Sequence, residues 1–140
     1  MSTIGHPLSD LANFLMPFHL ATQDPSAITN ASRGFLPGAT PGMPTVDEVA
    51  ALYFSVADQG SSTDTAAPDA ETRARALQWA QAFGIFRLAA ICQGIAARMA
   101  LRQASSEKAK QHAMARGPLA EFAWHMVEQV QGSAAEKPRL

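Results

Sequence analysis

The sequence predicts an all-α fold. Apolar residues recur at helical spacing in four segments, residues that commonly cap helices precede three of them, and no segment alternates apolar and polar residues as a half-buried strand does. With 140 residues, 47% of them hydrophobic, the chain is long enough to bury a core of its own. We expect one domain of four or five helices over residues 1–131 and a flexible tail over 132–140.

The first predicted helix runs from about Pro7 to Leu20, with Ser9 or Asp10 as its capping residue. Pro17 should kink this helix or end it early, because proline lacks an amide donor and its ring clashes with the preceding turn. Residues 21–44 then form a long connection. Its segment GFLPGATPGMP holds three glycines and three prolines in eleven residues, which excludes a helix or an inner strand there.

The second predicted helix begins near Thr45. Thr45 and Glu48 have the spacing of a capping box, in which each side chain accepts a hydrogen bond from the other residue's free amide. The apolar stripe of this helix comprises Val46, Val49, Leu52, Tyr53 and Val56. Small polar residues dominate positions 58–70, which we interpret as a mobile insertion.

The third predicted helix is the strongest, from Pro68 or Asp69 to about Gln103. Apolar residues surround nearly its whole centre, which predicts a helix buried in the middle of the domain. The aromatic residues at helical spacing on it should therefore belong to the core; they are Trp79, Phe83 and Phe86.

The fourth predicted helix is capped by Ser105 or Ser106 and reaches about Gln131. The pair Gly117-Pro118 is a point at which this helix can divide in two, which is why the expected number of helices is four or five. Its second part carries an apolar stripe of Leu119, Phe122, Ala123, Met126 and Val130.

Charge argues against two classes of partner. The formal net charge is −1, so the chain lacks the concentrated positive charge that nucleic acids or anionic membranes attract, and no apolar stretch approaches the roughly 18 residues of a membrane helix. The charge is nevertheless divided: residues 1–86 carry a net −5 and residues 87–140 a net +4. Either the two halves attract each other, or the basic half forms a wall for an anionic ligand.

Motifs of catalysis are scarce. The sequence has no P-loop, GxGxxG, HExxH, CxxC or GxSxG motif. His6 and Asp10 are four residues apart, which suits a local hydrogen bond or cap, since a metal site would need further ligands. Arg98 and Arg102 have the same spacing and form either a solvated face or an anion-binding pair. The single cysteine, Cys92, is expected to be a buried small hydrophobe in a reducing compartment, the cytoplasm.

Three stretches, in order along the chain, resemble one family. They are STIGHPLSDLANFL, GFLPGATPGMPTVDEVAALY and FGIFRLAAICQGIAARMALRQASS, and they resemble the carboxy-terminal part of aminoglycoside/choline-kinase-like phosphotransferases, in the branch associated with acyl-CoA dehydrogenases. The resemblance implies a protein-kinase-like fold, with this chain as the helical part of its C-lobe. It also implies ATP, magnesium and a small-molecule hydroxyl substrate for the full-length protein. In the family, a metal-binding acidic motif directly precedes the first stretch.

The resemblance therefore implies a chain without the nucleotide lobe, catalytic loop or metal-binding acids, inactive alone and binding no cofactor itself. Asp10 would brace the fold as a helix cap, and Arg87, Gln93 and Arg98 are candidates for the substrate wall. The alternative is a non-enzymatic helical interaction module that pairs with a partner chain or self-associates through an exposed apolar face. The ending Pro138-Arg139-Leu140 adds the peroxisome as an alternative location to the cytoplasm.

Overall fold

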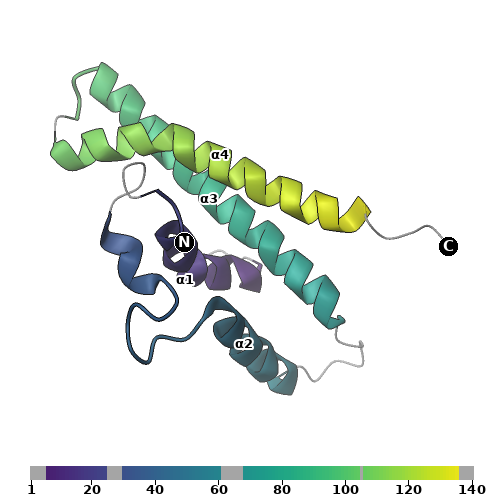
Figure 1. Cartoon of the computed structure of the whole chain (residues 1–140). Coiled ribbons are helices and arrows are strands. Elements are labelled where there is room, and N and C mark those ends of the chain that lie inside the picture. The colour runs from purple at the N-terminus through teal and green to yellow at the C-terminus, as the bar shows by residue number, and fades with distance from the viewer. Residues whose placement is uncertain (1–5, 25–29, 61–67, 105, 136–140) are drawn as a thin grey trace.

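The computed structural model describes residues 6–24, 30–60, 68–104 and 106–135, which contain no strand. The prediction of an all-α fold is confirmed for this part of the chain. Its elements are α1 (Pro7–Ala21), the 3-10 helix η1 (Asn30–Phe35), α2 (Val46–Gly60), α3 (Ala70–Ala100) and α4 (Glu107–Ala135) (Figure 1).

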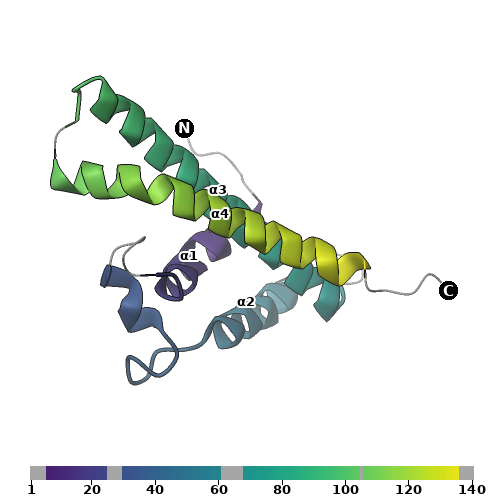
Figure 2. The ribbon, with the colours of Figure 1, turned by 45° about the horizontal axis from the view of Figure 1, so that its top comes forward.

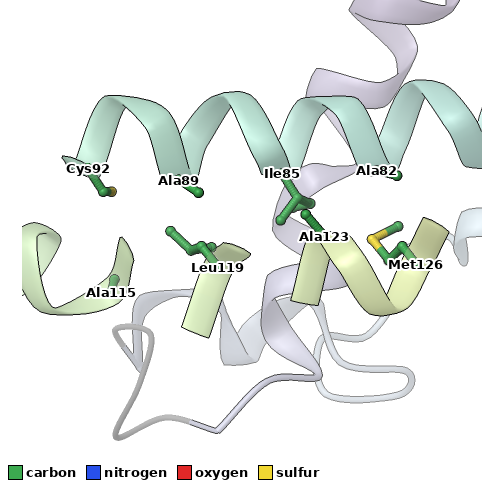
Figure 3. Close-up of a cluster of buried hydrophobic side chains, with 8 residues drawn as sticks. All are labelled: Ala82, Ile85, Ala89, Cys92, Ala115, Leu119, Ala123 and Met126. Atoms are coloured by element: carbon green, nitrogen blue, oxygen red, sulfur yellow. The ribbon is translucent and has the colours of Figure 1, made fainter. Parts of the chain in front are cut away.

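The two long helices, α3 and α4, form an antiparallel hairpin. The buried side chains of α3 follow a spacing of three and four residues, and they face a matching row from α4 (Figure 3). Four of the eight side chains are alanine, and such small residues let two helices approach closely. The cluster consists of Ala82, Ile85, Ala89 and Cys92 from α3, and Ala115, Leu119, Ala123 and Met126 from α4. As predicted, Cys92 is buried, as are Leu119, Ala123, Met126 and Val130.

The first helix, α1, packs against the other side of α3 (Figures 1 and 2). Gly84 makes room for this contact, because a Cβ atom there would lie 3.4 Å from Cε of Met16. The Arg87 guanidinium on α3 donates a hydrogen bond to Oδ1 of Asn13 on α1. Met16 and Leu20 pack on the hairpin core, so α1 connects that core to the rest of the molecule.

The second helix, α2, lies near the start of α3 (Figure 1). Its apolar residues join a second cluster, which holds Leu8, Leu11, Leu15 and Phe18 of α1, Leu77 of α3, and Val46, Val49, Ala50, Tyr53 and Phe54 of α2. The capping box at its start is formed: the Thr45 amide donates to Oε2 of Glu48 (2.7 Å), and the Glu48 amide donates to Oγ1 of Thr45 (3.3 Å). Leu52 and Val56, predicted to belong to the apolar stripe, are exposed instead.

The bounds of α1 agree with the predicted helix from about Pro7 to Leu20, but its capping residue and the effect of Pro17 do not. Its N-cap is His6, whose Nδ1 accepts a hydrogen bond from the Leu8 amide (3.3 Å), while Asp10 lies exposed within the first turn. The helix also continues past Pro17 to Ala21, so the expectation of an early end is wrong. Burial of neighbouring Leu15 and Phe18 offsets the cost of the lost hydrogen bond.

The other helices extend into the segments expected to be an insertion and a tail, and the last helix is continuous. The segment 58–70 was expected to be an insertion, but α2 extends to Gly60 and Asp69 caps α3, with residues 61–67 outside the described part. The last helix, α4, is undivided at Gly117-Pro118 and reaches Ala135, inside the predicted tail. Its cap is Ser106, whose hydroxyl accepts from the Ala109 amide (3.1 Å), and Ser105 lies outside the described residues.

The prediction that α3 is buried all round is wrong. Phe83 is 61% exposed, Phe86 58% and Trp79 41%, because α4 and α1 cover only two sides of the helix. By length and composition alone, α3 could cross a membrane, since its most apolar window has a mean hydropathy of 1.3 and a third of it is buried in this fold. Core helices of soluble proteins meet the same criterion, so this one helix is weak evidence for a membrane span.

Candidate functional site

A cleft of about 510 Å³ lies between α2 and α3, beside the last turn of α1. Apolar residues form most of its wall, and a few polar side chains converge on it, as is typical of small-molecule sites. The lining includes His19, Asp47, Phe54, Arg73, Leu77, Gln78 and Gln81. A second cavity of about 300 Å³ shares His19, Val46 and Asp47 with the cleft and extends toward η1 and Thr45.

His19 stands between these two cavities. The last turn of α1 holds it on the same face as Leu15, one turn earlier. Its Nε2 atom is buried and has no hydrogen-bond partner within the described structure. Burial lowers the pKa of His19, because a charged imidazole would lose its hydration. The ring is therefore neutral at neutral pH and can exchange a hydrogen bond with a bound molecule.

Arg73 contributes to the wall of the cleft but is already engaged. Its guanidinium makes a bidentate pair with Asp58, with both N–O distances 2.7 Å, and its Nε donates to the Pro68 carbonyl (2.8 Å). The same group lies 5.4 Å from the centre of the Phe54 ring. These bonds lower the pKa of Asp58 and raise that of Arg73. Arg73 therefore holds α2 against α3 rather than presenting a free cation to an anionic ligand.

Gln81 is the buried polar residue of the cleft wall. It is 6% exposed and lies on α3 one turn after Leu77, among apolar neighbours. Together, a neutral imidazole and a buried carboxamide suit a small polar molecule held by hydrogen bonds. Within the described residues, no three His, Cys, Asp or Glu side chains come together as a metal site would require, so none of them is assigned to magnesium.

The candidates for a substrate wall are not brought together. Arg87, Gln93 and Arg98 all lie exposed along α3, and none of them lines the two cavities described above. Arg87 instead joins α3 to α1 through Asn13. Of the predicted caps, Glu48 and Thr45 complete the start of α2, and Thr45 also lines the smaller cavity.

The sequence analysis missed the two residues that mark the cleft, His19 and Gln81. Each is a polar residue at helical spacing within an apolar stripe, four residues from Leu15 and from Leu77 respectively. That interruption was the available signal, because a polar group on a buried face needs a partner or a ligand.

Comparison of the chain with models of known families, with curated proteins and with solved structures finds no match. The resemblance to phosphotransferases is therefore carried by the three sequence stretches alone.

Proposed function

We propose that this chain is the C-terminal helical part of an ATP-dependent phosphotransferase that acts on the hydroxyl group of a small molecule. In this proposal the chain is not catalytic by itself. It contributes the cleft between α2 and α3 to the wall that receives the acceptor molecule. ATP and magnesium would bind to other parts of the full-length protein, and no step of phosphoryl transfer is assigned to residues of this chain.

The observation that supports this proposal is the spatial convergence of the three resembling stretches. The first provides most of α1 and the third provides α3 from Phe83 onward, and these two meet where Arg87 binds Asn13. The second stretch provides the start of α2, which joins the same apolar cluster as α1. Residues far apart in sequence thus form one packing unit, as expected if the stretches belong together in one domain.

The reading frame upstream of the Met1 codon tests the family assignment. The proposal expects an in-frame H-G-D-x-x-x-x-N motif followed by an acidic motif such as D-W-E. A stop codon directly upstream, in a gene without introns, would contradict it.

The cleft itself can be tested by nuclear magnetic resonance on the isolated chain. We expect millimolar choline, ethanolamine or an aminoglycoside to shift the signals of His19 and Gln81. In the variant Gln81→Leu the His19 signals should no longer shift, whereas in Gln93→Leu, which replaces an exposed glutamine on the same helix, the His19 and Gln81 signals should both still shift. If none of the three compounds shifts these signals, the cleft is not an acceptor wall for this class of compound.

A second candidate function is that of a helical interaction module without catalytic activity. It is favoured by the exposed aromatic residues of α3 and α4, which leave a large apolar surface uncovered. That surface is independent of the cleft.

A further inference from the structure

An apolar groove of about 300 Å³ runs between α3 and α4. We call it the aromatic face and define it by Trp79, Phe83 and Phe86 of α3 and Trp124 of α4; the buried Ala82 and Ala123 also line it. Phe83 and Trp124 are each 61% exposed. At 3.6 residues per turn, the aromatic residues of α3 lie roughly 140° around the helix from Leu77 and Gly84, which face α1. Neither α1 nor α2 can therefore cover them.

We propose that a second copy of this chain covers the aromatic face, with the two hairpins packed antiparallel as a four-helix bundle. The inference goes beyond the proposed function, because it does not involve the cleft. Such a pair would have two-fold symmetry, with the same surface used by both copies.

The exposed area suits an interface of this kind. Since an aromatic side chain offers about 150–250 Å², the four partly exposed rings present roughly 330–550 Å² per copy. Both copies together would bury about 650–1,100 Å² from these rings alone, and the flanking side chains would raise the total to the roughly 1,200 Å² of a stable interface.

The distribution of charge selects the antiparallel arrangement. The turn between α3 and α4 is basic: Arg98, Arg102, Lys108 and Lys110 are exposed beside the carboxylate of Glu107, and none of the four cations has an ion pair among the described residues. Among the described residues, the opposite end of the hairpin carries the carboxylates of Asp69, Glu71 and Glu128 and the cation of Arg75, since Arg73 is already paired with Asp58 of α2.

Antiparallel packing about the middle of the aromatic face places the basic turn of each copy beside the acidic end of the other. Parallel packing would place like charges side by side, which is unfavourable. Apolar burial would thus provide the affinity, and the end charges would set the orientation.

Sedimentation equilibrium of the whole chain over 5–500 μM tests the proposal. We expect a monomer–dimer equilibrium that Phe83→Ser weakens about thirtyfold or more, as for a central aromatic residue of an interface. The matched control is Phe14→Ser on α1, which removes a phenylalanine of almost equal exposure (62%) outside the groove and should leave the dimer unchanged. Circular dichroism verifies that both variants stay helical.

The charge arrangement has its own test. The double variant Arg98→Glu, Arg102→Glu should weaken the dimer, and so should 0.5 M NaCl. Two results of the sedimentation experiment would overturn the proposal. One is a chain that is still monomeric at 500 μM, and the other is a dimer that Phe83→Ser leaves intact. Unchanged or stronger association of the arginine variant would overturn the antiparallel arrangement. Binding to phosphatidylcholine–phosphatidylserine vesicles that Phe83→Ser abolishes would assign the face to a lipid surface instead. None of these results affects the cleft, so failure here is distinguishable from failure of the proposed function.

Discussion

At the scale of single residues, His19 holds the only buried side-chain polar atom without a partner within the described part of the chain. Water in the unfolded chain would solvate this imidazole in both of its protonation states. In the fold, burial disfavours the charged state and lowers the pKa. Through His19, the free energy of unfolding therefore depends on pH.

We predict that the free energy of unfolding decreases as the pH falls from 8 to 5.5. Below the unfolded-state value of 6.5, the unfolded chain binds a proton at His19 that the folded chain resists, so protonation favours unfolding. The carboxylates with lowered pKa values, among them Asp58 and Asp69, lose their stabilising ionisation only at lower pH, below their unfolded values of 3.8. Urea unfolding at four pH values measures the slope.

The variant His19→Gln should flatten this dependence, because it removes the titrating group. His125→Gln, at an exposed position on α4, should leave the dependence as it is. A wild-type stability that is constant between pH 8 and 5.5 would contradict the role given to His19.

At the scale of elements, two short-range capping signals were reliable. The spacing of Thr45 and Glu48 is that of a capping box, and Asp69 was one of two residues predicted to start α3, where its Oδ1 accepts a hydrogen bond from the Thr72 amide (2.8 Å). Both features depend on a few neighbouring residues, which is why sequence reveals them. The backbone hydrogen bonds at these caps lower the pKa of Glu48 and of Asp69.

We predict that Thr45→Ala destabilises the chain by about 1 kcal/mol, the usual cost of losing a threonine cap. The effect should be concentrated in α2, where hydrogen exchange of the backbone amides should accelerate. Ser55→Ala on the same helix is the control, because its hydroxyl donates only to the Leu52 carbonyl within the helix. Equal exchange in the two variants would remove the capping argument.

Substitutions at Gly84 and Gly94 distinguish the effect of helix propensity on stability from the effect of packing. Both lie inside α3, but a side chain at 84 meets Met16, whereas one at 94 has nothing within 4 Å. We predict that Gly84→Leu destabilises the fold by about 1–3 kcal/mol through overpacking against α1. Gly94→Leu should stabilise it by up to about 1 kcal/mol through better helix propensity. Thermal unfolding compares them, and a stabilising Gly84→Leu would show that α1 does not pack closely there.

What the sequence could not predict is which apolar sides become covered. Periodicity identified apolar residues nearly all round α3, but how many helices pack on it depends on the whole fold, so Phe83 and Phe86 were misplaced in the core. For a related reason, Pro17 does not end α1 early and Gly117-Pro118 does not divide α4: buried neighbours such as Leu15 and Leu119 keep both helices continuous. The sequence identified only Thr45, as a helix cap, and that residue lines the smaller cavity. His19 and Gln81 were not predicted, because they become a site only when α1, α2 and α3 meet.

At the scale of the whole molecule, the fold has two apolar clusters, and both include residues of α1 and α3. The clusters differ in how completely their side chains are buried. The hairpin core joins the middle of α3 to the middle of α4 (Figure 3). The second cluster joins α2 to α1 and α3 through partly buried side chains, helped by the ion pair between Arg73 and Asp58. Since local stability follows buried apolar contact, α2 should open more easily than the hairpin.

We therefore predict that amides of α2 exchange with solvent faster than those in the middle of α3 and α4. Leu119→Ala, which empties a site only 2% exposed in the hairpin core, should cost about 2–5 kcal/mol and reduce protection in α1, α3 and α4 together. Tyr53→Ala, in the second cluster, should reduce protection mainly in α2. Met114→Ala, at an exposed position of α4, should change neither pattern. Hydrogen exchange followed by mass spectrometry resolves the helices separately. If Tyr53→Ala exposed the hairpin amides as much as those of α2, the two clusters would unfold as one cooperative unit, and the weaker attachment of α2 would be refuted.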